Sequence, residues 1–242
     1  MSYDIGVQTY TYREFDVDGI VEAIEDLRVD VVEITGTHLA MDDDPAAVDR
    51  TIGAFEDLGA DVVGWSCPTP EEPGDAEEIL AFAGEYDIEY LNIDFDPADV
   101  AVAEALEAAG ERHGVNLGLH NHGPDPWSEF RTVDDVLGVV GSRAPCMGAC
   151  VDTGHFFRVD ERPADVIPAL EDRIHAVHVK DFVDAETEVV PGDSNLDMSE
   201  LLDLLDEHVS SPPPLVVEYE EDPDDPTAGV RTALDRLEAA GA

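Results

Sequence analysis

Short apolar runs alternate with longer amphipathic stretches along the whole sequence, and this alternation constrains the fold more than any other feature. The apolar runs are rich in Val and Ile and are continuous, which is typical of strands that are buried on both faces of a parallel sheet. They occupy residues 5–10, 29–34, 60–67, 88–95, 115–120, 145–152, 174–180 and 215–219.

Segments with the period of an amphipathic helix lie between these runs. In the first of them, Ile20, Ile24 and Leu27 fall on one helical face. The same period recurs in residues 98–109, 196–208 and 227–240.

Repeated β–α units joined by right-handed crossovers close into a barrel when eight of them follow one another. The alternative is an open doubly wound sheet, which usually has a glycine-rich turn after its first strand. Residues 11–14, which follow the first run, contain no glycine. We therefore predict an α/β fold in which residues 1–242 form a single (β/α)8 TIM barrel domain.

The charge balance is strongly acidic, with 58 Asp and Glu against 12 Lys and Arg and a formal net charge of -46. Because 43% of the residues are hydrophobic, the chain is not an acidic disordered polymer. Its negative surface disfavours nucleic acid and membrane surfaces as partners. The spread of carboxylates and the single lysine, Lys180, resemble proteins of extreme halophiles, and we predict that the chain requires salt to fold.

The sequence shows none of the usual export signals. No run approaches the roughly 20 apolar residues of a membrane span, and the N-terminus has no basic and apolar leader pattern. The three cysteines, Cys67, Cys146 and Cys150, are too few for a disulfide framework. We expect a cytoplasmic protein with free cysteines, and the sequence leaves open whether it forms a homo-oligomer.

Polar residues gather where the apolar runs end, which in a TIM barrel is the end that carries the chemistry. Buried polar groups are costly unless they are paired or bind a cation, so any one of them alone is explained by a hydrogen-bonded rim residue. Together, mixed Asp, Glu and His side chains suit one divalent ion, such as Mn²⁺, Mg²⁺, Co²⁺ or Zn²⁺. The residues concerned are Glu33, His120, His122, Glu129, Asp152, His155, His178, Lys180 and Glu218.

Three motifs in this order resemble one known family. They are the segments LHNH at 119–122, VDTGH at 151–155 and VHVKD at 177–181. The sequence resembles, over nearly its whole length, the xylose isomerase-like TIM barrel family. That family comprises sugar phosphate isomerases and epimerases, inosose dehydratases and endonuclease IV-type enzymes.

The resemblance implies a ligand set for the metal. Asp152, His178 and Glu218 match the family's ligands, and Glu129 is the expected fourth ligand, with His120 in reserve. The alternative for Glu129 is that it caps the following helix.

The resemblance also implies an isomerase or epimerase that acts on a small-molecule sugar or keto-sugar through a metal-stabilised enediolate. Candidate bases are Glu33, His122 and His155, or the glutamates Glu129 and Glu218. His120, His122 and Lys180 are candidate substrate contacts. Lys180 offers a compact charge for a substrate oxygen, unless it simply pairs with Asp181.

Three alternatives stay open at this point. One is an inosose-type dehydratase on the same site, and another is a non-catalytic metal- or sugar-binding barrel. An endonuclease IV-like phosphodiesterase is disfavoured because the extra histidine ligands are missing.

The substrate's charge is also open, since Arg13 and Arg158 are candidates for holding a carboxylate or phosphate. Four aromatic residues are candidates for stacking on a sugar, although packing is the better interpretation of the first: Trp65, Trp127, Phe156 and Phe157.

Overall fold

Eight parallel strands close into a barrel in the computed structural model, which describes residues 1–66, 69–126 and 128–242. Around the barrel the strands follow the order β1-β10-β7-β6-β5-β4-β3-β2. This arrangement confirms the predicted (β/α)8 TIM barrel. The strands are β1 (Ile5–Gln8), β2 (Val31–Thr35), β3 (Asp61–Ser66), β4 (Tyr90–Ile93), β5 (Asn116–His120), β6 (Met147–Asp152), β7 (Ile174–Val179) and β10 (Leu215–Val217).

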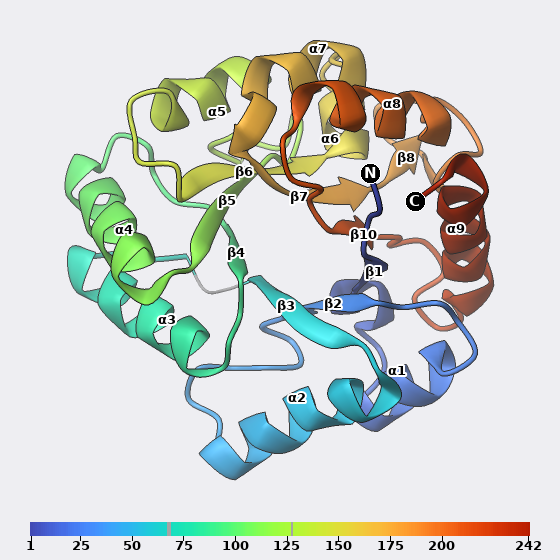
Figure 1. Cartoon of the computed structure of the whole chain (residues 1–242), viewed down its shortest axis with the longest axis horizontal. Helices are drawn as coiled ribbons and strands as arrows, with labels where there is room; N and C mark the ends of the chain where they lie inside the picture. Colours follow the sequence, from blue (N-terminus) through green and yellow to red (C-terminus); the bar gives the residue numbers. More distant parts are fainter. Residues whose placement is uncertain (67–68, 127) are drawn as a thin grey trace.

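The helices form an outer ring around the strands (Figure 1). Several begin at an aspartate whose side chain accepts backbone N–H groups of the first turn, so part of the acidic excess serves as helix caps. The helices of the ring are α1 (Val17–Ile24), α2 (Pro45–Leu58), α3 (Pro73–Glu85), α4 (Val100–His113), α5 (Val133–Val140), α7 (Pro163–Leu170), α8 (Met198–His208) and α9 (Thr227–Ala240).

Some of the apolar runs continue beyond their strands. The first run passes into a 3₁₀ helix, η1 (Thr9–Tyr12), and the sixth strand leads directly into a short helix, α6 (Thr153–Phe157). A second 3₁₀ turn, η2 (Glu171–Arg173), precedes β7. The expected run 60–67 corresponds to β3, while its last residue, Cys67, lies outside the described residues.

A small antiparallel hairpin follows β7, and the sequence patterns did not indicate it. It pairs β8 (Asp181–Phe182) with β9 (Glu188–Val189). The carboxylate of Asp181 accepts backbone N–H groups of Gly192, Ser194 and Asn195, which anchors the segment after the hairpin. Strands of two residues are too short to show a period, so the pattern analysis could not detect them.

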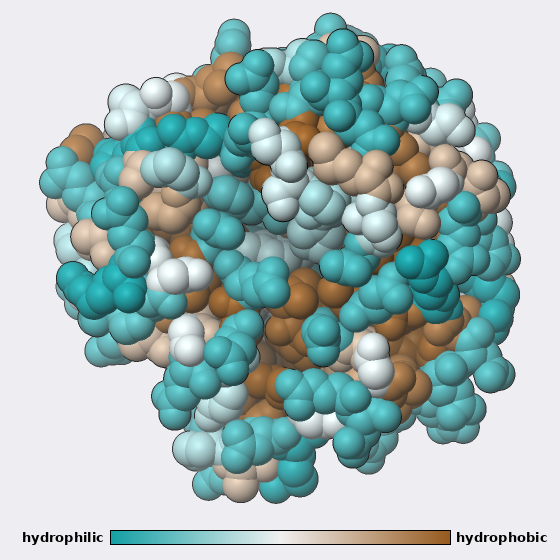
Figure 2. Space-filling view, viewed as in Figure 1, coloured by the Kyte–Doolittle hydropathy of each residue, from teal (hydrophilic) through white to brown (hydrophobic). Residues whose placement is uncertain are grey.

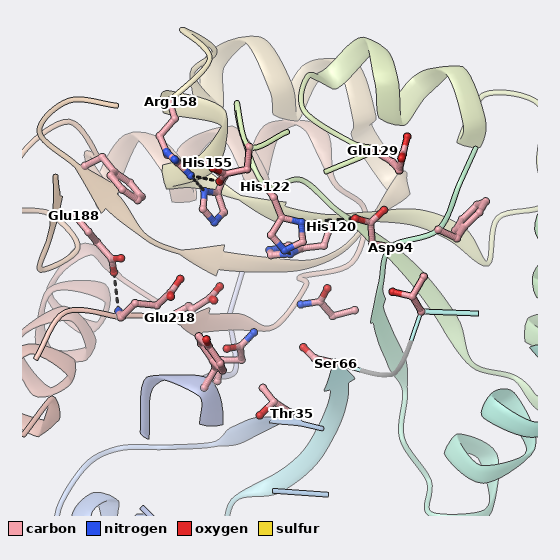
Figure 3. Close-up of a pocket in the computed structure, with 18 of the residues that line it drawn as sticks. Thr35, Ser66, Asp94, His120, His122, Glu129, His155, Arg158, Glu188 and Glu218 are labelled. Carbon is pink, nitrogen blue, oxygen red and sulfur yellow. Dashed lines mark hydrogen bonds and ion pairs between the residues drawn. The ribbon is translucent and has the colours of Figure 1, made fainter. Parts of the chain in front are cut away.

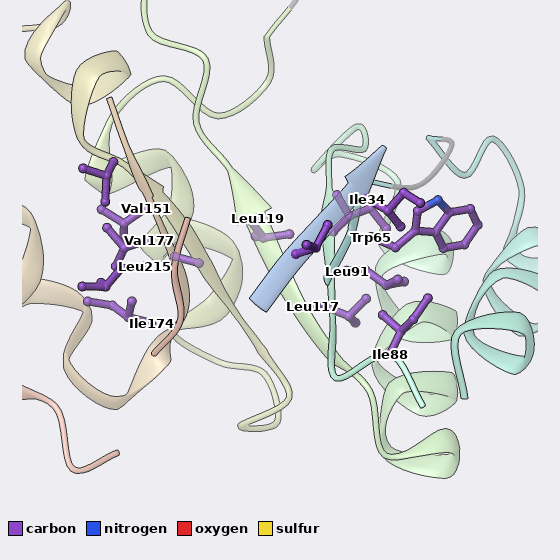
Figure 4. Packing of buried hydrophobic residues seen from close by; sticks show 14 of the residues in the cluster. Ile34, Trp65, Ile88, Leu91, Leu117, Leu119, Val151, Ile174, Val177 and Leu215 are labelled. Atoms are coloured by element: carbon purple, nitrogen blue, oxygen red, sulfur yellow. The ribbon is translucent and has the colours of Figure 1, made fainter. Parts of the chain in front are cut away.

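Two separate groups of buried residues form the core. The larger one lies between the outward faces of the strands and the helices, where alternate residues such as Val32 and Ile34 point (Figure 4). The smaller one consists of Val31, Val63, Tyr90, Cys150 and Ala176 and lies inside the barrel. Small side chains leave room there for one large ring.

Gly64 provides part of that room. A Cβ atom at this position would lie 2.3 Å from Cζ of Tyr90, so a larger residue would displace the ring. The position of Tyr90 matters because its hydroxyl reaches the polar residues at the barrel mouth. Among the described cysteines, Cys146 and Cys150 are both free, as expected.

Hydrophilic residues cover most of the face seen in Figure 2, with smaller hydrophobic areas between them. In the described ranges, no helix is both long enough and apolar enough to cross a bilayer.

Candidate metal centre

A cavity of about 750 Å³ opens at the carboxyl ends of the strands (Figure 3). Each of several strands contributes a polar side chain to its wall at the point where the strand ends. Examples are Thr35, Ser66, Asp94, His120 and Glu218. The chemistry-bearing residues therefore meet where a TIM barrel places its active site.

Four buried side chains form a cluster, and two of them, His120 and Glu218, line this cavity. His120, Asp152, His178 and Glu218 each offer one ligand atom, and these atoms all lie within 4.8 Å of one another. They come from or directly follow β5, β6, β7 and β10, which are consecutive in the barrel. The barrel closure thus brings together residues that are up to about a hundred positions apart in the sequence.

Two atoms of this cluster lack a hydrogen bond within the described part of the chain. They are Nε2 of His120 and Oδ2 of Asp152, which are buried and 3.7 Å apart. An unpaired buried polar atom is destabilising, and two that face each other call for a common partner. A set of two imidazoles and two carboxylates fits a divalent ion such as Zn²⁺ or Mn²⁺.

His178 lies between two carboxylates. Its Nδ1 is 2.7 Å from Oε2 of Glu218, and its Nε2 is 2.8 Å from Oε2 of Glu33. Burial acts to lower the pKa of His178, but Cys150, Glu33 and Glu218 together raise it well above its usual value. A carboxylate behind one ring nitrogen fixes the imidazole so that the other nitrogen faces the cluster, as is common for metal-binding histidines.

Glu33 is the carboxylate that lies behind Nε2 of His178. Its carboxylate also accepts hydrogen bonds from Tyr90, Ser66, Asn92 and Gln8. Burial raises the pKa of Glu33, but the nearby His178 and the hydrogen bonds outweigh it and lower the pKa to about 2. So stable an anion accepts a proton poorly, and the role of Glu33 as a base stays a prediction.

The other histidines of the cavity are neutral. Burial lowers the pKa of His120 to about 3, that of His122 to about 2 and that of His155 to about 3. Nδ1 of His120 is 2.9 Å from Nε2 of His122, while Nδ1 of His155 accepts a hydrogen bond from Arg158. Neutral imidazole is the form that binds metal ions, so His120 is in the protonation state that a ligand needs, whereas His178 would have to release a proton to bind one.

Lys180 is completely buried and does not pair with Asp181. Its ammonium group contacts Glu220 and lies 3.5 Å from Oε1 of Glu218 and 3.9 Å from Oε2 of Glu188. Burial lowers the pKa of Lys180, but these carboxylates raise it above its usual value, so the side chain is charged. Lys180 lies beside the cavity wall without lining it, and its contact with substrate stays a prediction.

Glu129 lies on the cavity wall, outside the four-residue cluster. Its side chain is exposed, and the neighbouring Asp94 is closer to the histidines, with Oδ2 4.0 Å from Nδ1 of His122 (Figure 3). Burial, followed by the charge of Glu129, raises the pKa of Asp94 to about 6.

Sequence reasoning missed five carboxyls of the cavity wall, namely Asp94, Asp96, Asp125, Glu188 and Glu220. Asp94 was detectable, because it is a charged residue within the apolar run 88–95 at the end of β4. Glu188 was not, because the hairpin that carries it has no sequence period.

In the described part of the chain, none of the aromatic candidates lines the cavity. Trp65 is buried, donates its Nε1–H to the carbonyl of Leu39 and packs against Phe82, as expected for a packing residue. Phe156 is also buried. Phe182, which the sequence did not suggest, lines the cavity, and Trp127 lies outside the described residues.

Comparison with known proteins gives consistent results. A xylose isomerase domain protein from Planctomyces limnophilus is 16% identical, with a TM-score of 0.76 over 99% of this chain and 98% of that chain. The 3-keto-D-glucoside 4-epimerase YcjR from E. coli is 17% identical, with a TM-score of 0.72 over 99% of each chain. The IOLI protein with a binding zinc atom is 16% identical, with a TM-score of 0.74 over 98% of this chain and 96% of that chain.

At these identities the solved structures show a shared fold and no more. A search of curated proteins returned no match. The family model described as xylose isomerase-like TIM barrel, however, matches residues 6–240, which is nearly the whole sequence. The closed eight-stranded barrel agrees with this match, which shows that the chain belongs to the xylose isomerase-like TIM barrel family.

Proposed function

We propose that the protein is a divalent-metal-dependent isomerase or epimerase of sugars. The observation that carries the proposal is the buried cluster at the barrel mouth, whose ligand atoms lie within 4.8 Å of one another and include two without a hydrogen-bond partner in the described chain. The family match and the likeness to a sugar epimerase and to a zinc-containing protein support it.

Asp152, His178 and Glu218 hold the ion in this proposal. Their fourth partner is His120, whose Nε2 faces Oδ2 of Asp152, while Glu129 remains the alternative expected from the family resemblance. When bound, a divalent ion polarises a substrate carbonyl and stabilises the negative charge of an enediolate. The protein's own part is to bind the ketose beside this centre and to move a proton.

Asp94 is the carboxyl best suited to move that proton. Its pKa is raised to about 6 by burial and by Glu129, which is close to the working range of a general base. Its Oδ1 is buried and accepts no hydrogen bond within the described chain, so it is available to a substrate C–H group. Figure 3 shows Asp94 and Glu218 on opposite sides of the cavity histidines, so a substrate between them would present a different face to each.

A dehydratase is the second candidate, because Glu188 is suited to donate a proton. It lines the cavity from the β8–β9 hairpin, and burial raises its pKa to about 8, although Lys180 acts to lower it. A carboxyl that is protonated at neutral pH can donate its proton to a leaving hydroxyl group. A product that is lighter than the substrate by one water would favour dehydration over isomerisation.

The test is deuterium incorporation from D₂O into a panel of neutral ketoses, followed by NMR with Mn²⁺-supplied protein in molar KCl. We expect exchange at the carbon beside the carbonyl, and a loss of at least about 100-fold in Asp94→Asn with the metal content unchanged. Asp96→Asn removes an equal charge from the same wall and should keep the wild-type rate. Metal-loaded wild type that exchanges no proton with any ketose would overturn the proposal, and equal rates in Asp94→Asn would remove Asp94 from it.

A further inference from the structure

The cavity wall carries far more negative than positive charge. Among the described residues, seven carboxyl side chains line it, whereas Arg158 is its one lysine or arginine. Asp94 and Glu129 lie on one side of the histidines, and Glu188 and Glu218 lie on the other (Figure 3). A bound anion would therefore meet the carboxylates of Asp94 and Glu129 on one side and that of Glu218 on the other.

A metal ion does not remove this excess. The two positive charges of a divalent ion are balanced by the two carboxylates of its own cluster, Asp152 and Glu218. Lys180 is matched by Glu220. In the described chain, Asp94 and Glu129 pair with no lysine or arginine, so the wall stays negative with the centre loaded.

Arg158 is the side chain that an anionic substrate would need, and it is already occupied. Its Nη1 donates to Oδ2 of Asp125 at 2.8 Å and to Nδ1 of His155 at 3.0 Å. Its Nε donates to the carbonyl of Ala185 at 2.9 Å, and its guanidinium lies over the ring of Phe182. The pair with Asp125 neutralises the charge at this point of the wall.

The other rim arginine is held in a similar way. Arg13 donates to the carbonyls of Glu220 and Tyr10 and lies over the Tyr10 ring, 5.0 Å from its centroid. It does not line the cavity. Neither arginine named as a possible anion holder on sequence grounds is thus presented to a ligand as a free guanidinium group.

We infer that the cavity accepts neutral polyhydroxy ketones and rejects their phosphorylated and carboxylate-bearing counterparts, and that Asp125 enforces this selectivity by holding Arg158. This inference rests on the proposed function, because it names the substrate class of the same site. Contact between a substrate anion and the wall carboxylates weakens binding of that substrate strongly. Molar salt screens such repulsion only at separations above about 3 Å, so close contacts stay repulsive.

The test compares a neutral ketose with its phosphate ester in wild type, Asp125→Asn and Asp96→Asn. Both variants remove one negative charge from the cavity wall, but only Asp125→Asn removes the charge that neutralises Arg158. We expect kcat/KM for the phosphate ester to be at least about 100-fold lower in wild type. The ratio of kcat/KM for the neutral ketose to kcat/KM for its phosphate ester should fall by roughly tenfold in Asp125→Asn and stay at the wild-type value in Asp96→Asn.

A second readout does not depend on turnover. Calorimetric titration with inorganic phosphate should show about tenfold tighter binding to Asp125→Asn than to wild type or Asp96→Asn. A wild type that uses the phosphate ester as well as the neutral ketose would overturn the inference and leave the proposed function intact. Identical behaviour of the two variants in both readouts would overturn the role of Asp125. If no ketose reacts, the proposed function fails, and the phosphate titration alone decides whether the wall rejects anions.

Discussion

At the scale of single residues, the fourth position of the metal cluster is the sharpest question. His120 contributes a buried nitrogen that lacks a hydrogen-bond partner in the described chain, whereas Glu129 is exposed on the cavity wall. We therefore expect His120→Gln to weaken Mn²⁺ binding by at least about tenfold, and Glu129→Gln to bind it as wild type does. Competition with a fluorescent chelator measures both. A loss confined to Glu129→Gln would instead establish the ligand set implied by the family resemblance.

His175 provides a pH dependence that is separate from the metal cluster. Burial lowers its pKa in the folded state to about 4, below the value of 6.5 for an unperturbed histidine. The unfolded chain therefore binds this proton more readily between pH 6.5 and 4, so the free energy of unfolding falls as the pH falls through that range. The slope is about 1.4 kcal/mol per pH unit for this group.

Urea titrations across this pH range test the effect. His175→Gln should flatten the pH dependence by that slope, whatever its effect at pH 7. His208→Gln, at the end of α8, serves as the control and should leave the slope as it is. An unchanged slope in His175→Gln would contradict the prediction.

The sequence was informative about residues where a charge interrupts an apolar run. Glu33, Asp152, His178 and Glu218 were selected for that reason, and the structure brings them together at one end of the barrel. Which of them touches the metal and which stands behind a ligand depends on side-chain direction. A sequence pattern does not contain that information.

At the scale of elements, the barrel was predictable because its strands are buried on both faces and its helices on one. Their ends were less predictable, because an apolar run continues into whatever follows the strand. Residues 9 and 10 belong to η1, and α6 starts where β6 ends, since the Asp152 carboxylate accepts the N–H of His155. The hairpin β8–β9 depends on contacts that Asp181 makes with residues more than ten positions away.

Gly64 in β3 gives a prediction at this scale. Alanine there would place its Cβ 2.3 Å from Cζ of Tyr90 and force the ring away from Glu33. We expect Gly64→Ala to lower the free energy of unfolding by roughly 1–3 kcal/mol. Gly53→Ala in α2 meets no atom within 4 Å and should be neutral or slightly stabilising. Urea unfolding of the two variants measures the difference, and equal stability would show that the barrel interior adjusts freely.

At the scale of the whole molecule, the net charge of -46 dominates the balance between folding and self-repulsion. In molar salt the Debye length falls to about 3 Å, so repulsion between separated carboxylates is screened. We predict that Tm falls by on the order of 10 °C when KCl is reduced from molar to about 0.1 M, or roughly 3–5 kcal/mol for a chain of this length.

Circular dichroism at a series of KCl concentrations measures this. An uncharged osmolyte at matched osmolality should not replace KCl, because it does not screen charge. A Tm that is independent of KCl would contradict the prediction.

Elemental analysis decides whether the barrel mouth binds one divalent ion. The protein is purified in molar KCl without chelator as wild type, Glu218→Gln and Glu221→Gln, the last being an exposed glutamate three positions further on. We expect about one equivalent of Mn, Co or Zn in wild type and in Glu221→Gln, and a loss of that metal in Glu218→Gln. Wild type that holds no metal, and takes up none when Mn²⁺ is supplied, would contradict it.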